Sequence, residues 1–416
     1  MRKLSIVLLL AWCLAPIAYA ANGVYDVVAD YSAVGDGTTN NTTAFQNALN
    51  QASSDGGGLV TVPTGDFLLS GTISIPANVT LQGVFVAPSR WVEGTVLLTT
   101  TGHGSSGATP FITMGDSSGL VGVTVEHPSQ THTNPPVAYP WVVRGNGSHI
   151  TIKNVLLLRP YQGIDLGTNS GCDYHLVENV YMQSLNKGVM IDQCKGGTMK
   201  NIHQWPFYSP DPESPYWPYM ENNCYGFWVG DAEDEVGYNL FTIFLKYGMM
   251  FDDLGNGEGS GTYTSCYMDI VNVEGIRIEE ANTTKGLTFI DCATNARKGC
   301  YIASSNSGPI NMTAGGFYKH DTDTHIDADG GVITINDCWF CDWADNTSSA
   351  PCIDVDAHGV IVSGCHFRIA YASRTKVRLQ SNCRAAVVAG NRMQSGANIT
   401  DNTTSGSDVQ IGLNTG

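Results

Sequence analysis

Short apolar runs recur along this chain at a nearly constant distance from one another. Each run is four residues long, with mostly apolar second and fourth positions and a variable third position. Such alternation is typical of a β-strand that buries one of its faces. Successive runs begin 22 to 27 residues apart, except for one step of 38 residues. The runs occupy residues 163–166, 188–191, 226–229, 248–251, 275–278, 299–302, 325–328, 352–355 and 376–379.

A second set of positions keeps the same period. Its members are Asn154, Asn179, Asn201, Asn239, Cys266, Cys292, Gly315, Cys338, Cys365 and Asn391. A period near 25 with short strands is typical of one coil of a parallel β-helix, in which each strand stacks on its predecessor about 4.8 Å away. An antiparallel sandwich would not keep two sets aligned. We therefore predict an all-β protein, a single-stranded right-handed parallel β-helix of about ten or more coils with a short N-terminal capping helix.

The N-terminal segment predicts how this β-helix begins. Residues 30–45 and 56–65 read DYSAVGDGTTNNTTAF and GGGLVTVPTG, and Thr42 or Thr43 can cap a short helix that reaches Ala52. These runs resemble the N-terminal module of the pectate-lyase-like superfamily, of the kind found in proteins related to pectate lyase 3 and polygalacturonase. The resemblance implies that the helix covers the open end of the stack. It leaves the reaction open, because that superfamily includes hydrolases, lyases and non-catalytic binders.

The first twenty residues are typical of a secretory signal peptide. Arg2 and Lys3 precede an apolar run, and small residues stand near Ala20. We therefore expect a secreted protein, extracellular or periplasmic, without a membrane span. The expected organisation is a signal peptide at 1–20 and one β-helix domain at 21–416, with a cap at 21–85, coils at 86–416 and an inserted loop at 195–223.

Strand alternation also predicts which side chains leave the core. The third residues of the runs should face outward, and they are Asp165, Met190, Trp228, Met250, Arg277, Tyr301, Asp327, Asp354 and Arg378. The residues that follow the runs should do the same, and they are Gly167, Asp192, Gly230, Asp252, Glu279, Ala303, Asp329, Asp356 and Gln380. Carboxylates one rung apart repel and raise each other's pKa. We interpret this strip of acids and large side chains as a functional groove.

The 38-residue step contains an aromatic insertion. Trp205, Tyr208 and Trp217 are among its large rings, and several prolines stand between them. Aromatic faces stack on sugars, and a stiff loop loses little entropy on binding. The alternative is a loop that packs its rings against the flank of the coils. Cys194 and Cys224 flank the insertion, and a disulfide between them would staple it beside the groove.

The richest acidic patch predicts sugar chemistry. Hydrolysis of a glycosidic bond needs one carboxylic acid and one carboxylate. Asp231, Asp252, Asp253 and Glu279 fall on consecutive coils. The Asp252-Asp253 pair, one coil after Asp231, resembles the paired aspartates of polygalacturonase-type hydrolases. That resemblance implies that Asp253 or Asp252 is the general acid and that Asp231 with its neighbour activates water.

The match to polygalacturonases is incomplete. Val229-Gly230-Asp231 stands where that family has Asn-Thr-Asp, and no Gly-His-Gly follows one coil later. A polysaccharide lyase is the alternative enzyme, with Arg277 or Lys246 as the base and calcium held by the carboxylates. No tight calcium-loop motif is present, so for a hydrolase we expect neither metal nor cofactor. A non-catalytic carbohydrate-binding β-helix is the third hypothesis.

The net charge of the chain argues against some classes of binding partner. The net charge of −17 argues against nucleic acid, which needs a basic surface, and it disfavours a strongly polyanionic substrate. We therefore expect a polysaccharide or oligosaccharide partner, and a monomer or a homotrimer. The predicted substrate-binding residues are Asp192, Trp205, Tyr208, Trp217, Trp228, Arg277 and Tyr301.

Overall fold

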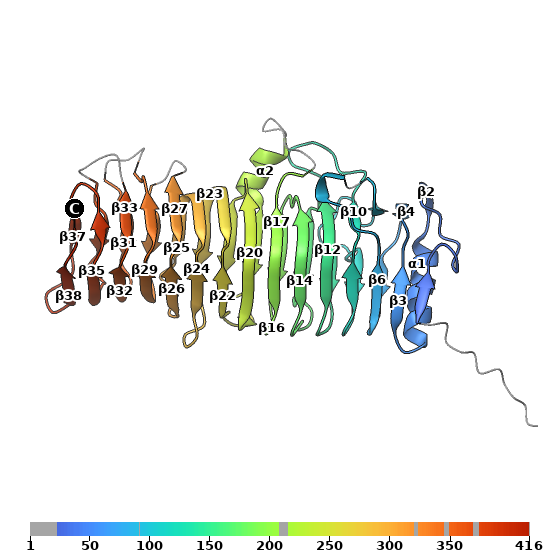
Figure 1. Cartoon of the computed structure of the whole chain (residues 1–416), viewed down its shortest axis with the longest axis horizontal. Coiled ribbons are helices and arrows are strands. Elements are labelled where there is room, and N and C mark those ends of the chain that lie inside the picture. The colour runs from blue at the N-terminus through green and yellow to red at the C-terminus, as the bar shows by residue number, and fades with distance from the viewer. Residues whose placement is uncertain are drawn as a thin grey trace, which may run out of the picture.

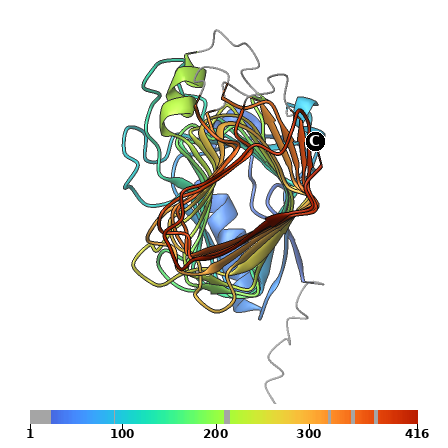
Figure 2. The same cartoon turned by 90° about the vertical axis from the view of Figure 1, so that its left-hand side faces the viewer.

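The fold is a right-handed parallel β-helix of about 14 turns (Figure 1), as the sequence predicts. The structure is a computed structural model, and it describes residues 23–90, 92–207, 215–319, 323–344, 349–368 and 374–415. Figure 2 looks along the stack and shows the coils superimposed around a common interior. That interior is filled by buried apolar side chains from nearly every coil. The predicted signal peptide lies outside the described residues.

Three long faces run along the stack, and the first of them carries the predicted groove. Face 1 is formed by strands that pair in parallel from coil to coil. They are β5 (Ile73–Ile75), β8 (Ile112–Met114), β11 (Trp141–Gly145), β13 (Gln162–Leu166), β15 (Lys187–Ile191), β18 (Tyr225–Val229), β21 (Tyr247–Phe251), the ends of β23 (Tyr267–Ile278) and β25 (Ala293–Ile302), β28 (Ile326–Ala328), β31 (Ile353–Val355), β34 (Val377–Leu379) and β37 (Ile399–Asp401).

Faces 2 and 3 follow in each coil. Face 2 contains β1 (Val24–Asp26), β3 (Gly58–Thr61), β6 (Val79–Gln82), β9 (Gly119–Val121), the first halves of β12 (Thr151–Leu158), β14 (Leu176–Met182), β17 (Thr198–Gln204) and β20 (Glu235–Ile243), then β22 (Gly261–Thr264), β24 (Leu287–Ile290), β26 (Pro309–Thr313), β29 (Val332–Asn336), β32 (Gly359–Ser363), β35 (Ala385–Ala389) and β38 (Asp408–Gly412). Face 3 contains β2 (Asp36–Asn40), β4 (Gly65–Leu69), β7 (Thr95–Thr99), β10 (Thr124–Glu126), the second halves of β12 to β20, the starts of β23 and β25, then β27 (Gly316–Lys319), β30 (Trp339–Cys341), β33 (His366–Arg368) and β36 (Arg392–Met393).

The corner between faces 2 and 3 is a one-residue turn that repeats in register. Asn154, Asn179, Asn201 and Asn239 occupy it with φ between 52° and 56°. Asparagine tolerates this left-handed conformation better than most residues. Asn179, Asn201 and Asn239 each donate an amide hydrogen bond to the asparagine of the preceding coil, over 2.7 to 2.9 Å. The ladder explains why asparagine recurs at this position.

The second sequence register changes column within the stack. The turn residue after Asn239 is Ser265, with φ 52°, and not Cys266. The cysteines of that set therefore stand one place after the turn. Cys266, Cys292, Cys338 and Cys365 are buried in the core.

The N-terminal helix forms as predicted, but it is capped differently. Helix α1 (Thr42–Ser54) packs against β1, β3, β5 and β6 at the blue end of the stack in Figure 1. Its N-cap residue is Asn41, which makes no side-chain capping bond. Instead, the Asn41 side chain accepts from the Val34 amide at 2.7 Å and donates to the Val34 carbonyl at 2.9 Å. Asn41 thus secures the preceding loop.

Three minor elements complete the fold. They are a 3-10 turn, η1 (Pro88–Arg90), a two-stranded sheet of β16 (Cys194–Lys195) and β19 (Ala232–Glu233), and helix α2 (Tyr216–Asn223). Helix α2 lies within the insertion, where the sequence pattern predicts only a loop. None of the helices in the described part of the chain is long and apolar enough to cross a membrane.

Candidate active site on face 1

The predicted outward column of face 1 is in register. Trp228 pairs with Met190 on one side and Met250 on the other. Met250 then pairs with Arg277, which pairs with Tyr301. The column is not uniformly open to solvent, because Met190 and Met250 are buried.

Asp165, in the same column, is completely buried, and its charge is compensated locally. The Arg144 guanidinium lies 2.6 Å from its carboxylate, and Thr168 donates a further hydrogen bond to it. Buried charges are stable only when they are paired in this way. Asp165 is therefore part of the scaffold.

A second column lies beside the first and combines aromatic rings with cations. It runs in register through Trp141, Gln162, Lys187, Tyr225, Tyr247, Glu274 and Lys298. The Lys187 Nζ lies 4.8 Å from the ring centre of Trp228. The Tyr225 and Trp228 rings stack at 5.0 Å. Such cation–π and stacking contacts fix the rings in place.

Sequence reasoning missed this second column. All of its residues except Trp141 directly precede a glycine that opens an apolar run, as Lys187 precedes Gly188 and Tyr225 precedes Gly226. Strict alternation counts such a position as inward. The available signal was the glycine itself, because glycine inside a strand often marks an irregularity of the ladder.

Asp252 and Glu279 lie together where face 1 turns into face 2. Phe251 pairs with Ile278, so the two acids follow on adjacent coils. Burial raises the pKa of Asp252, and the nearby charges of Glu279 and Asp253 raise it further. Asp252 is thus biased toward its protonated form.

Glu279, in contrast to Asp252, forms an ion pair with Arg277. The Arg277 Nε donates to Glu279 Oε1 over 2.6 Å, and Arg277 also forms an ion pair with Glu274 at 3.2 Å. The guanidinium lies 5.0 Å from the Tyr301 ring. The predicted residues Arg277, Glu279 and Tyr301 therefore form one connected group beside Asp252.

Asp231 lies one coil and Asp192 two coils further toward the N-terminus, and their environments differ. Asp192 is only 3% exposed, and its two oxygens accept from the Asp231 amide at 2.9 Å and from the Asn256 side chain at 2.7 Å. Both of its oxygens are thus engaged in hydrogen bonds within the protein. Burial, followed by the charges of Asp192, Glu233 and Asp253, raises the pKa of Asp231.

The Asp253 side chain stabilises the turn that follows it. Its carboxylate accepts from the amides of Gly255 and Gly257 at 2.6 and 3.1 Å, and these bonds lower its pKa. A group held ionised in this way is a poor proton donor.

Glu280 also belongs to the acidic cluster. Burial raises its pKa, and the charges of Asp253 and Glu258 add to the shift.

The described residues of the insertion that follow residue 214 pack against the coils, at the corner between faces 3 and 1. Trp217 stacks on Phe244 with 3.8 Å between ring centres, and Tyr219 shares a 2.9 Å hydrogen bond with Tyr161. Trp205 remains 44% exposed, beside Phe241 of face 3. Tyr208 lies outside the described residues.

The predicted disulfide between Cys194 and Cys224 is wrong. Both thiols are free and buried, but in different places. Cys194 belongs to the main core, whereas Cys224 packs with Leu185 and Leu245 in a small cluster under α2. The ends of the insertion are thus held by separate apolar contacts.

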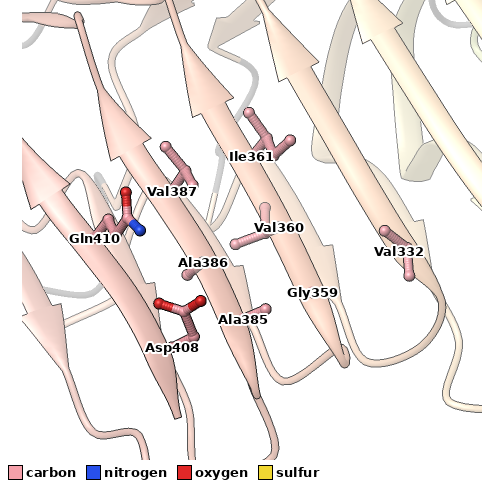
Figure 3. Close-up of a pocket in the computed structure, with 9 residues that line it drawn as sticks. All are labelled: Val332, Gly359, Val360, Ile361, Ala385, Ala386, Val387, Asp408 and Gln410. Carbon is pink, nitrogen blue, oxygen red and sulfur yellow. The ribbon is translucent and has the colours of Figure 1, made fainter.

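Other surface features carry less chemistry. A hollow on face 2, lined by nine residues of β29, β32, β35 and β38, is shown in Figure 3, and its lining is mostly apolar. Asp408 is its one titratable side chain. Among the described residues, no three His, Cys, Asp or Glu side chains are grouped to hold a metal ion.

Comparison with known proteins agrees with this architecture. Residues 26–204 match the family model described as rhamnogalacturonase A/epimerase, pectate lyase-like. A search of curated proteins finds no match. The match and the parallel β-helix fit the pectate-lyase-like superfamily that the N-terminal runs resemble.

Several solved structures are similar in fold. The Agl-KA catalytic domain is 12% identical, with a TM-score of 0.53 over 95% of this chain and 69% of that one. The exopolygalacturonase of Thermotoga maritima is 12% identical, with a TM-score of 0.45 over 91% of each chain. The A-module of the mannuronan C-5 epimerase AlgE6 of Azotobacter vinelandii is 13% identical, with a TM-score of 0.46 over 94% of this chain and 98% of that one.

Proposed function

We propose that this protein is a secreted carbohydrate-active enzyme that hydrolyses glycosidic bonds of a polysaccharide on face 1. The observation that carries the proposal is that Asp252 and Glu279 lie on adjacent coils, directly after the paired residues Phe251 and Ile278. Asp252 has a raised pKa, whereas Glu279 on the next coil is in an ion pair with Arg277. Two neighbouring carboxyl groups in different environments are what acid–base cleavage of a sugar bond needs.

The roles follow from these environments. Asp252 donates a proton to the leaving oxygen, and Glu279 acts as the carboxylate that activates water or attacks the sugar carbon. Asp231, whose pKa is raised, is the alternative partner on the other side of Asp252. We assign Asp192 and Asp253 to positioning the loop between β21 and β22.

The polysaccharide substrate is supported from two sides. The matching family model is described by the names of a rhamnogalacturonase and an epimerase. The aromatic side chains of face 1, Trp228, Tyr225, Tyr247 and Tyr301, offer the flat apolar surfaces on which sugars stack. The matched region ends at residue 204, before the acidic cluster, so the roles of the acids rest on geometry.

The test is a panel of polysaccharides that is read for reducing ends and for absorbance near 235 nm. We expect reducing ends without the chromophore. Asp252→Asn should lower kcat by about 10²- to 10⁴-fold while binding is kept. Asp253→Asn is the matched control, and it should retain most of the turnover. Equal losses in both variants would contradict the role given to Asp252.

A lyase is the second candidate, and one observation favours it. Lys246 forms no ion pair within the described part of the chain, and its Nζ lies 4.8 Å from the Tyr247 ring. Arg277, by contrast, is tied to two carboxylates, and its pKa is raised. Lys246 is therefore the better base. Absorbance at 235 nm that disappears in Lys246→Met would establish the lyase, and binding without either product would indicate a binding protein.

Secretion has its own test. Expression of the full chain in a host with an export pathway should give a mature protein that begins near Ala21. Mass spectrometry of the exported protein would identify the first residue. Retention of the full chain inside the cell would contradict the proposal.

A further inference from the structure

Lys187 is a half-buried cation whose ammonium lies over aromatic rings. It lies on face 1, two coils before Asp252, with its Nζ 4.8 Å from the Trp228 ring centre and 5.8 Å from that of Trp141. No hydrogen bond or ion pair reaches its ammonium from the described residues. Burial lowers the pKa of Lys187, and the charge of Asp165 offsets this only in part.

Most other cations of face 1 are neutralised, whereas Lys246 and Lys376 form no ion pair among the described residues. Arg144 pairs with Asp165, Arg277 with Glu274 and Glu279, Lys298 with Asp327, and Arg378 with Asp354. Lys187 thus lacks the carboxylate partner that most cations of this face have. A cation of this kind is costly to bury unless an anion comes to it.

Two further polar atoms beside Lys187 lack partners. The Oε1 of Gln162 and the Nε1 of Trp228 are buried and form no hydrogen bond. Gln162 is only 7% exposed, and it pairs in register with Lys187. A buried polar atom without a partner costs about 1–3 kcal/mol, which a bound ligand recovers.

We infer that Gln162, Lys187 and Trp228 form a binding subsite for a negatively charged sugar unit of the polymer. The ammonium and the indole N–H are both donors, and they suit a carboxylate or a sulfate group. The Gln162 oxygen is an acceptor, and it suits a hydroxyl of the same unit. A neutral sugar would leave the ammonium uncompensated. The inference rests on the proposed polysaccharide substrate and names its class.

The protein's net charge of −17 adds a condition to this binding. At long range the protein repels a polyanion, whereas Lys187 attracts it locally. The repulsion acts between exposed charges and is screened by salt, whereas the half-buried contact is screened less. Loss of the Lys187 cation should therefore weaken the binding of an anionic chain.

The experiment is calorimetric binding in the Asp252→Asn background. The probes are polygalacturonate and κ-carrageenan, each beside its carboxyl-reduced or desulfated derivative, so that a carboxylate and a sulfate are told apart. We expect one anionic probe to bind, and Lys187→Met to weaken that binding at least tenfold while the binding of its neutral derivative stays unchanged. Lys200→Met is the matched control, because Lys200 pairs with Glu178 on face 2, and it should change nothing.

Folding and function are controlled separately. Trp228→Phe keeps an aromatic ring and removes the N–H, so it should weaken the same probe severalfold, and it replaces Lys187→Met if that variant does not fold. Equal binding of charged and neutral probes, or no loss in either variant, overturns the subsite. Full turnover in Asp252→Asn with loss of anion binding in Lys187→Met would reject the catalytic roles and keep the subsite. Hydrolysis of a neutral polymer that needs Asp252 but not Lys187 would support the catalytic roles and reject the subsite.

Discussion

The backbone amide of Asp231 donates a hydrogen bond of 2.9 Å to the Asp192 carboxylate on the preceding coil. The other oxygen of Asp192 accepts from Asn256, in the loop between β21 and β22. Three consecutive coils are thereby joined through one buried side chain. This link sets where Asp231 stands and how the loop after Asp252 folds over it.

Asp192→Asn tests this link. The amide has only one acceptor oxygen, so one of the two hydrogen bonds is lost inside a buried site. We expect a loss of about 1–3 kcal/mol in the free energy of unfolding, measured by equilibrium urea denaturation. Asp234→Asn is the control, because Asp234 is exposed and its pair with Lys285 is worth at most about 1 kcal/mol. Equal effects would show that Asp192 is not a special anchor.

The pH dependence of turnover tests the proton donor. The charge of Asp253 contributes to the raised pKa of Asp252, after burial and Glu279. Asp253→Asn removes that negative charge, which lowers the pKa of Asp252. Because the reactive form is protonated, the alkaline limb of kcat/KM should move to lower pH. A limb that stays in place or moves upward would contradict the assignment.

Acid stability depends on His325, which is completely buried. Burial lowers its pKa to about 4, from 6.5 in the unfolded chain. Between these values only the unfolded chain binds the proton, so stability falls as the pH falls from 6.5 to 4, by roughly 3 kcal/mol. His325→Phe should flatten this part of the stability curve, as measured by urea denaturation at several pH values. His358→Gln, at an exposed site, should leave the curve unchanged.

The asparagine ladder is tested at its middle member. Asn201 has φ 52°, donates to Asn179 at 2.8 Å and accepts from Asn239 at 2.9 Å. Asn201→Ala adds backbone strain to the loss of both bonds and should cost about 2–4 kcal/mol. Asn201→Gly relieves the strain and loses only the bonds, so its cost in urea denaturation should be smaller. The opposite order would show that backbone strain is not what asparagine avoids here.

Much of the fold could be predicted from the sequence because a β-helix repeats its local physics in every coil. The spacing of the apolar runs gave the coil length, and alternation placed Trp228, Arg277 and Tyr301 on one strip. The sequence pattern did not predict that the turn position after Asn239 falls one residue before the cysteines. The turn residues there, Ser265 and Asp291, are no longer asparagine, and cysteines follow them at the same spacing.

The site was harder to predict, since its details depend on contacts between coils. The sequence does not indicate that Asp192 is buried or that Asp253 serves a turn, because both facts depend on hydrogen bonds to other loops. The helix α2 was missed because its eight residues are too few for a clear helical period and contain a proline. Lys187 was missed because strict alternation pointed it inward.

The one-residue corner between faces 2 and 3 limits where the length of the connections in this protein can vary. An added residue there would interrupt the stacked ladder of left-handed turn residues. The long connections, including 127–140 and 205–224, instead leave from the corner between faces 3 and 1, beside the proposed substrate. Natural variation or loop grafting at that corner can therefore alter which glycans are accepted while the winding of the stack stays intact.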